Sequence, residues 1–211
     1  MLTLHHLGIS QSDRVVWLCE ELGIAYDLVR YDRDPQSRMA PAAYRALHPF
    51  GTAPVISDGD LVLGETGAIF DYIIAVYGGG RLKLEPAAPG YADFLFWYHF
   101  ANGSFMPAIM VDMIVSRVAP DPKAVAALTA RSTRAWEMVE TRLGAAAWFA
   151  GDAFTAADVM MVFPLTTMRA FLPKDLTTFP NVRAYLQRVG ARPAYRAAME
   201  KADPGVPLRL D

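Results

Sequence analysis

An acid and a hydroxyl stand side by side where a helix is predicted to begin, at Glu65 and Thr66. The first turn of a helix has unpaired N–H groups and a partial positive charge, so it binds a carboxylate well. Thr66 can add a hydroxyl donor for that carboxylate, and Glu65 would attract an ammonium group. The pair therefore suits the zwitterionic end of an amino acid. The alternative is that Thr66 caps the helix and Glu65 is an ordinary surface acid.

Two more hydroxyls, Ser10 and Ser12, stand at the predicted start of an earlier helix. A hydroxyl at a helix N-terminus can donate a hydrogen bond to a thiolate, which stabilises the anion and lowers the pKa of the thiol. A Cys-x-x-Cys motif here would indicate disulfide exchange, but this segment contains no cysteine. The alternative for Ser10 is helix capping, with Asp13 as its partner.

Pro54 lies in the apolar run Ala53–Ser57, directly before a hairpin signal. Proline cannot donate a backbone hydrogen bond, so it sits at the start or the edge of a strand. It can also form a cis bond, which exposes the neighbouring backbone in a fixed pose. A role in strand entry and a role in binding both remain open at this point.

The first third of the chain alternates short strands and helices. Apolar residues at helical spacing predict a helix from residue 10 that stops at Gly23, and Asp58-Gly59-Asp60 predicts a hairpin turn. The predicted strands are residues 2–8, 26–31, 53–57 and 61–65, and the predicted helices are residues 10–22, a short irregular one within 34–47, and 66–78. The order is βαβαββα, with a parallel first pair of strands and an antiparallel second pair.

A linker separates this part from the rest, because residues 78–90 read GGGRLKLEPAAPG. Beyond it, long helical patterns dominate and no convincing strand or internal repeat is found. Breaks in these patterns are expected at Pro107, Pro120, Pro122, Gly151 and Pro173. The fold class is therefore a small α/β domain at residues 1–78, a linker at 79–89 and an all-helical domain at 90–211.

The composition limits the classes of function. The chain of 211 residues is 53% hydrophobic and 20% charged, so a buried hydrophobic core is expected. Its net charge of −2 gives no electrostatic reason to expect nucleic acid or an anionic membrane as a partner. No apolar stretch approaches the roughly 20 residues that span a bilayer, and the start MLTLHHLG does not resemble a signal peptide. A single cysteine, Cys19, fits a reducing cytoplasm. The histidines His5, His6, His48 and His99 share no metal-ligand spacing, so no metal is expected.

The order of elements, the entry HPFGTAPVI and the sequence GETGAI resemble the thioredoxin-like half of cytosolic glutathione S-transferases. The resemblance continues in GDAFTAADVMMVFPL, where Thr155 and Asp158 form a predicted capping box that Phe154 precedes as a hydrophobic staple. FPNVRAYLQRVGARPAYRAAM resembles the penultimate helix of the family and the turn after it. WYHFANGSFMPAIM is similar to the start of the helical domain in a bacterial and fungal subgroup.

The resemblance implies a binding site for glutathione. Pro54, after Ala53, would be the cis-proline, Val55 would pair with the cysteinyl backbone, and Glu65 with Thr66 would hold the γ-glutamyl end. Many relatives carry Lys, Arg or Gln where this chain has Thr52, so Arg38 or another cation would have to bind the glycyl end.

The reacting group follows from the same resemblance. Ser10 lies four residues before Arg14, the spacing at which serine-type transferases place the catalytic hydroxyl. Ser12 and a backbone N–H remain alternatives, and Arg14 is expected to support structure. The expected activity is attack of the glutathione thiolate on a hydrophobic electrophile. A glutathione-dependent peroxidase or isomerase, or a non-enzymatic binding protein, is the alternative.

A second pocket, for the electrophile, is expected in the helical domain. Its candidate residues are Tyr98, His99, Phe105, Met106 and Met110. Aromatic residues and methionines at helical spacing are also typical of an ordinary core, so both interpretations stay open. The resemblance further implies a homodimer.

Overall fold

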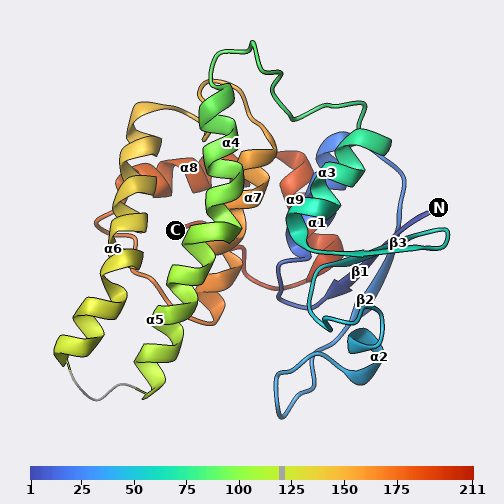
Figure 1. Cartoon of the computed structure of the whole chain (residues 1–211), viewed down its shortest axis with the longest axis horizontal. Helices are drawn as coiled ribbons and strands as arrows, with labels where there is room; N and C mark the ends of the chain where they lie inside the picture. The colour runs from blue at the N-terminus through green and yellow to red at the C-terminus, as the bar shows by residue number, and fades with distance from the viewer. Residues whose placement is uncertain (119–121) are drawn as a thin grey trace. The chain divides into compact units, whose positions relative to one another are not determined.

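The computed structural model describes residues 1–118 and 122–211, and these divide into two compact units (Figure 1). The first unit contains Met1–Leu82 together with Gly190–Leu208, and the second contains Lys83–Val189 together with Arg209–Asp211. The helical domain expected from the sequence includes residues 190–208, whereas the structure groups them with the first unit. Pro120, one of the expected helix breaks, lies outside the described residues.

A four-stranded mixed sheet forms the centre of the first unit. Its strands are β1 (Leu2–Leu7), β2 (Asp27–Tyr31), β3 (Val55–Asp58) and β4 (Leu61–Gly64), in the spatial order β2-β1-β3-β4. β1 is parallel to β2 and antiparallel to β3, and β3 and β4 form an antiparallel hairpin. The turn of this hairpin contains Gly59 at a φ of 58°, a conformation that glycine adopts without steric cost. The predicted strands, their directions and the thioredoxin-like fold are confirmed.

Three helices complete the predicted order of the first unit: α1 (Asp13–Leu22), α2 (Ala42–Arg45) and α3 (Thr66–Val76). The apolar residues that predicted the first helix form its buried face: Val15, Val16, Leu18, Cys19 and Leu22. The helix ends at Gly23, which adopts a φ of 62° and closes the last turn with a left-handed cap. Local sequence alone therefore specifies both the buried face and the end of α1.

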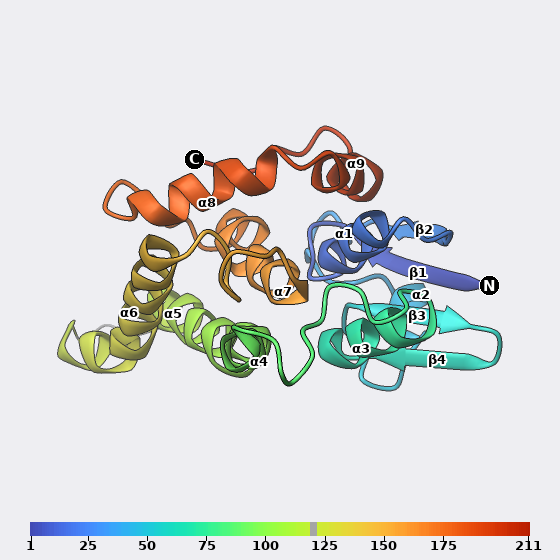
Figure 2. The same ribbon diagram turned by 90° about the horizontal axis from the view of Figure 1, so that it is seen from above.

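The chain's last helix, α9 (Pro193–Ala202), packs against α1 in the same unit (Figure 2). The rings of Trp17 and Tyr195 meet edge to face, with their centroids 5.0 Å apart. Arg192 donates to both carboxylate oxygens of Glu21 at 2.6 and 2.7 Å. An aromatic contact and a bidentate ion pair, both largely buried, thus hold the C-terminal helix on the first unit.

Helices make up the second unit within the described residues. They are α4 (Tyr91–Phe100), the π-helical segment η1 (Ala101–Phe105), α5 (Met106–Val118), α6 (Pro122–Ala145), α7 (Ala156–Leu165), the 3-10 segment η2 (Thr167–Ala170) and α8 (Pro180–Gly190). Every residue of α7 is buried, which makes it the central helix of this unit. Among the described residues of this part, the strand-like pairing is limited to an isolated bridge between Trp148 and Gly151.

The predicted capping box at the start of α7 is confirmed. The Thr155 side chain accepts from the amide of Ala157, and the Asp158 carboxylate accepts the amide of Thr155 at 2.9 Å. Asp158 also accepts the amide of Phe149 at 2.9 Å. The Phe154 ring, before the cap, packs edge to face on another aromatic ring. No helix among the described residues is long and apolar enough to cross a membrane.

Candidate active site

The loop between β1 and α1 carries both predicted catalytic serines and buries them. Ser10 and Ser12 expose only 5% and 3% of their surfaces. Their hydroxyl oxygens lie 2.7 Å apart, and the Ser10 hydroxyl also donates to the Leu7 carbonyl at 2.6 Å. The Ser12 oxygen accepts the Leu7 amide proton at 3.1 Å. The two hydroxyls form one hydrogen-bonded unit, so a change at Ser12 also alters the surroundings of Ser10.

Helix capping does not explain the Ser12 hydroxyl. The N-cap of α1 is Ser12, and its side chain makes no capping hydrogen bond. Ser10 Oγ accepts the Ser12 amide at 3.3 Å, and the Asp13 amide donates to the Ser10 carbonyl, so the capping alternative for Ser10 stays open. Both hydroxyls also contact the Leu7 carbonyl at the end of β1.

A buried histidine and a carboxylate lie next to the serines, and the sequence had not pointed to them. His6 Nδ1 lies 2.9 Å from Ser12 Oγ, and His6 Nε2 lies 3.3 Å from Asp203 Oδ2. Asp203, directly after α9, also accepts the Ile9 amide. Sequence reasoning considered His6 only as a metal ligand. No pattern links positions 6 and 203, because their approach depends on the packing of α9.

Arg14 connects the start of α1 to the start of α3. Its side chain is fully buried. The guanidinium donates to the Gln11 side chain and, at 3.4 Å, to the Thr66 hydroxyl. This contact supports the prediction that Arg14 has a structural role, and it brings the two helix N-termini together.

The Glu65–Thr66 pair lies at the predicted helix start, but Thr66 does not cap the helix. Thr66 is the first residue of α3 and is 2% exposed, while Glu65 occupies the N-cap without a side-chain capping bond. Glu65 is exposed and has a φ of 69°, which is uncommon for a residue with a side chain and costs about 1–3 kcal/mol. A strained backbone that presents an acid to solvent beside a buried hydroxyl is a reason to assign function to this pair.

The entry to β3 has the backbone that the resemblance implied. The Ala53–Pro54 bond is cis, and Pro54 is buried. Val55, the first residue of β3, is opposite His5 on β1 and Gly64 on β4. The strand that would meet a peptide ligand is therefore held between two neighbours and leads through β4 directly to Glu65.

The residues expected at the glycyl end are exposed. Thr52 and Arg38 both face solvent, and Arg38 has a φ of 61°. Arg33, which the sequence did not single out, donates to the carbonyls of Gly8, Ile9 and Arg38. It joins the loop that carries Arg38 to the loop that carries the serines.

The five residues expected to line a hydrophobic pocket differ in exposure. Tyr98, Phe105 and Met106 are buried in the second unit, where Phe105 contacts the ring of Trp136. His99 and Met110 are exposed. The burial of the first three agrees with the alternative that they belong to an ordinary core. Neighbouring residues line a cavity of about 460 Å³ in this unit: Phe100, Ser104, Arg131, Arg134, Ala135 and Met138.

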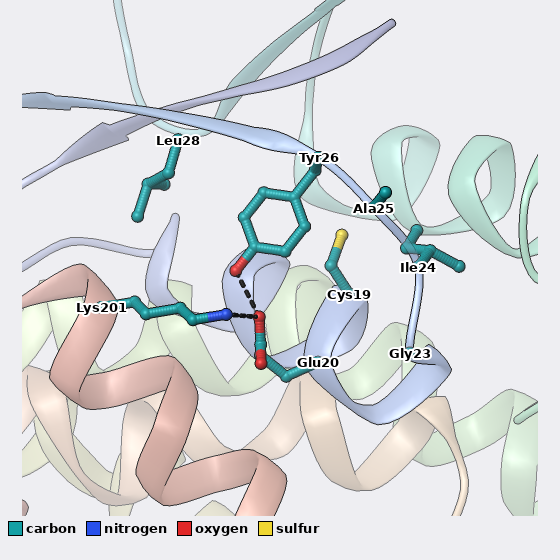
Figure 3. A pocket seen from close by; sticks show the side chains of 8 residues that line it. All are labelled: Cys19, Glu20, Gly23, Ile24, Ala25, Tyr26, Leu28 and Lys201. Atoms are coloured by element: carbon teal, nitrogen blue, oxygen red, sulfur yellow. Dashed lines mark hydrogen bonds and ion pairs between the residues drawn. The ribbon is translucent and has the colours of Figure 1, made fainter.

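Another cavity, of about 560 Å³, lies at the C-terminal end of α1 (Figure 3). It contains the Glu20 carboxylate, which accepts from the Tyr26 hydroxyl and from Lys201 Nζ, both at 2.6 Å. Burial raises the pKa of Cys19, which also lines it, so this thiol is not a reactive nucleophile. Because the polar groups of this cavity satisfy one another, they do not indicate a ligand.

No metal site is found in the described part of the chain. Among residues 1–118 and 122–211, no group of three or more His, Cys, Asp or Glu could hold a metal ion.

Comparisons with known proteins agree with the geometry. A family model for the glutathione S-transferase N-terminal domain matches residues 2–75, and one for the C-terminal domain matches residues 104–193. Glutathione S-transferase 3 of Schizosaccharomyces pombe is 30% identical over 96% of this chain and 88% of its own length. Glutathione S-transferase 1 of Saccharomyces cerevisiae is 25% identical over 96% of this chain and 95% of its own. The crystal structure of a glutathione S-transferase from Actinobacillus pleuropneumoniae, 30% identical, superposes with a TM-score of 0.87 over 100% of this chain and 99% of its own.

Proposed function

The chain belongs to the glutathione S-transferase family, and from this premise we propose that it joins the sulfur of glutathione to a small hydrophobic electrophile. Glutathione is the cosubstrate, and no metal takes part. The protein acts in the cytoplasm as a homodimer, and its second unit contributes to the site for the electrophile. The proposal for that site retains Tyr98, His99, Phe105, Met106 and Met110.

The observation that carries this proposal is the contact between two helix N-termini in the first unit. Arg14, in the first turn of α1, donates to Thr66, the first residue of α3. The two serines precede Arg14, and Glu65 precedes Thr66. One helix start can thus hold an anionic sulfur while the other holds an amino-acid zwitterion, as a γ-glutamyl peptide with a thiol requires.

Each of these residues binds a different part of glutathione. Glu65 binds the ammonium group, and Thr66 with the N-terminus of α3 binds the γ-glutamyl carboxylate. Val55, after Ala53 and the cis-proline Pro54, pairs with the backbone of the cysteinyl residue. The glycyl carboxylate lies toward Thr52, which is uncharged, and Arg38 supplies the cation.

The chemical step requires the thiolate. A free thiol has a pKa near 8.5, so only a few per cent is ionised at neutral pH. The Ser10 hydroxyl, with the α1 N-terminus, stabilises the anion, and each unit by which the pKa falls corresponds to about 1.4 kcal/mol. The sulfur electron pair then forms a bond to the electrophilic carbon, and the leaving group departs with its bonding electrons.

The test is the rate of conjugation of a chlorinated aromatic by Ser10→Ala. Loss of one hydrogen bond to a developing anion typically costs about 10²–10³ in rate. Ser116→Ala is the matched control, because Ser116 is an exposed helical serine whose hydroxyl bonds only within its own helix, to Met113. An unchanged rate in Ser10→Ala would remove Ser10 from the mechanism and leave Ser12 or a backbone N–H.

Two experimental outcomes would assign a different function to the protein. Rapid reduction of peroxides or isomerisation of enediones without conjugation would show that the same thiolate serves another reaction. Absence of heat and of a melting shift with millimolar glutathione would support a binding protein without activity. The uncharged Thr52 is the feature that favours this last possibility.

A further inference from the structure

A buried histidine lies directly behind the two serines, and the proposed function gives it no role. His6 exposes 1% of its surface. Its two ring nitrogens face Ser12 and Asp203, at 2.9 and 3.3 Å. Together with the 2.7 Å separation of the serine oxygens, these contacts form a series from Asp203 to Ser10, in which His6 and Asp203 lie at ion-pair distance without a hydrogen bond.

This chain of groups has two possible hydrogen-bond directions, because each hydroxyl has a single proton to donate. When Nδ1 of His6 carries no proton, it accepts from Ser12, and Ser12 can accept from Ser10. When both ring nitrogens are protonated, Nδ1 donates to Ser12, Ser12 donates to Ser10, and the Ser10 proton is directed outward. In the second direction Ser10 accepts from Ser12, and its own proton is available to a thiolate.

We propose that His6 and Asp203 are positioning residues of the glutathione site, and that His6 takes up the thiol proton through Ser12 and Ser10. This inference rests on the proposed function and deepens it. The protonation of His6 reverses the hydrogen bonds of both hydroxyls, so that ionisation of the thiol and alignment of its donor are one event.

The transfer moves one proton at each step. The thiol proton bonds to the Ser10 oxygen, the Ser10 proton passes to Ser12, and the Ser12 proton passes to Nδ1 of His6. The S–H bonding pair stays on sulfur, which becomes the thiolate, and nothing is oxidised or reduced. Ser10 is suited to this exchange because its oxygen lies 2.7 Å from the Ser12 oxygen and 2.6 Å from the Leu7 carbonyl, so its proton has two acceptors.

The groups around Asp203 keep a negative charge next to His6. Asp203, after α9, accepts the Ile9 amide at 3.0 and 3.2 Å, and it interacts with Arg30 of β2. Arg33, after β2, donates to the Ile9 carbonyl. Burial alone would raise the pKa of Asp203, but His6, the Ile9 amide and Arg30 outweigh it and hold the pKa below its usual range. An ionised carboxylate therefore faces His6 at neutral pH.

The test counts protons while the thiolate forms. Wild-type protein is titrated with glutathione, the thiolate is measured by its ultraviolet absorbance, and calorimetry in buffers of different ionisation enthalpy measures the protons released. We expect thiolate to form with little net release, because His6 retains the proton. Release of about one proton for each thiolate would overturn the proposal.

Variants provide the second measurement. In His6→Asn we expect the thiolate fraction at neutral pH to fall at least severalfold, and kcat/KM to fall by about 10², the lower range for a lost proton-transfer group. Asp203→Asn, which keeps an acceptor for the Ile9 amide, should lie between this variant and the wild type. His5→Asn is the matched control, because His5 is the adjacent residue on β1 and bonds to Tyr31 and Ser57, not to Ser10 or Ser12.

Binding of S-methylglutathione, which has no thiol proton, separates the possible failures. We expect wild type, His6→Asn and His5→Asn to bind it with similar affinity. If the wild type binds neither this compound nor glutathione, the proposed function fails, and this inference fails with it. If all bind and His6→Asn keeps the wild-type thiolate fraction, only this inference fails. Should His6→Asn not fold, the proton count on the wild type still decides.

Discussion

Replacement of Asp158 by alanine is expected to be among the most destabilising single changes in the second unit. The fully buried carboxylate accepts two backbone amides, those of Phe149 and Thr155, each at 2.9 Å. A buried donor that loses its acceptor costs about 1–3 kcal/mol, so Asp158→Ala should lower the free energy of unfolding by roughly 2–6 kcal/mol. The free energy of unfolding of a native protein is only about 5–15 kcal/mol, so the variant would be marginally stable.

The same residue gives a pH dependence with a definite sign. Burial raises the pKa of Asp158 from 3.8 to about 7, against the opposing effect of the Phe149 and Thr155 amides. The folded protein thus holds this proton more tightly than the unfolded chain does. The stability that this bound proton contributes is complete below pH 3.8 and is lost as the pH rises through about 7. Asp158→Asn cannot ionise, so its stability relative to the wild type should increase over this interval.

Chemical denaturation followed by tryptophan fluorescence measures both effects, because Trp97, Trp136 and Trp148 belong to the second unit. Thr155→Ala is the matched control: it removes the capping hydroxyl but keeps the carboxylate, and should cost only about 1 kcal/mol. If Asp158→Ala costs no more than Thr155→Ala, the carboxylate does not hold the two amides as argued. Parallel pH profiles of wild type and Asp158→Asn would refute the raised pKa.

Substitutions at three places test the first unit: Arg14, Glu65 and the Glu21–Arg192 pair. Arg14→Met should weaken glutathione binding about tenfold, which corresponds to roughly 1.4 kcal/mol, because it removes the contact between the two helix starts. Calorimetry measures this affinity, and an unchanged value would show that the contact does not contribute to binding. Glu65→Gln should weaken binding by a similar factor without changing the melting temperature, whereas Glu65→Gly should raise stability by about 1 kcal/mol by relieving the positive φ. Glu21→Gln should lower the free energy of unfolding by about 2 kcal/mol in urea, since it breaks the bidentate pair with Arg192; an equal loss in Arg192→Met is expected, and no loss in either would contradict the pairing.

Local features of the sequence predicted the elements well, because each depends on residues close in the chain. The spacing of apolar residues and the stop at Gly23 define α1 without reference to the rest of the molecule. The hairpin turn at Gly59 and the capping box of Thr155 and Asp158 are also complete within a few residues. Each of these signals corresponds to a hydrogen bond or a buried face that the segment forms by itself or with its neighbour.

Burial and distant pairing could not be obtained in this way. Tyr98 and Phe105 have the composition of a ligand pocket and of a core alike, and only the packing of other helices against them determines their exposure. The π-helical segment η1, before Pro107, has no comparable sequence signal. The approach of His6 to Asp203 depends on the path of nearly the whole chain, so no spacing rule could reveal it.

The position of α9 explains why the C-terminal segment matters to a site formed by the N-terminal loop. Arg192 anchors the start of this helix to Glu21, and Lys201 anchors its last turn to Glu20. Asp203 directly follows α9, so the contacts that hold α9 on α1 also place its carboxylate near His6 and the Ile9 amide. The serine loop is complete only after contacts between residues more than 150 positions apart have formed. A loosened α9 would therefore disturb the direction of the serine hydroxyls before it disturbed the sheet or the Glu65–Thr66 pair.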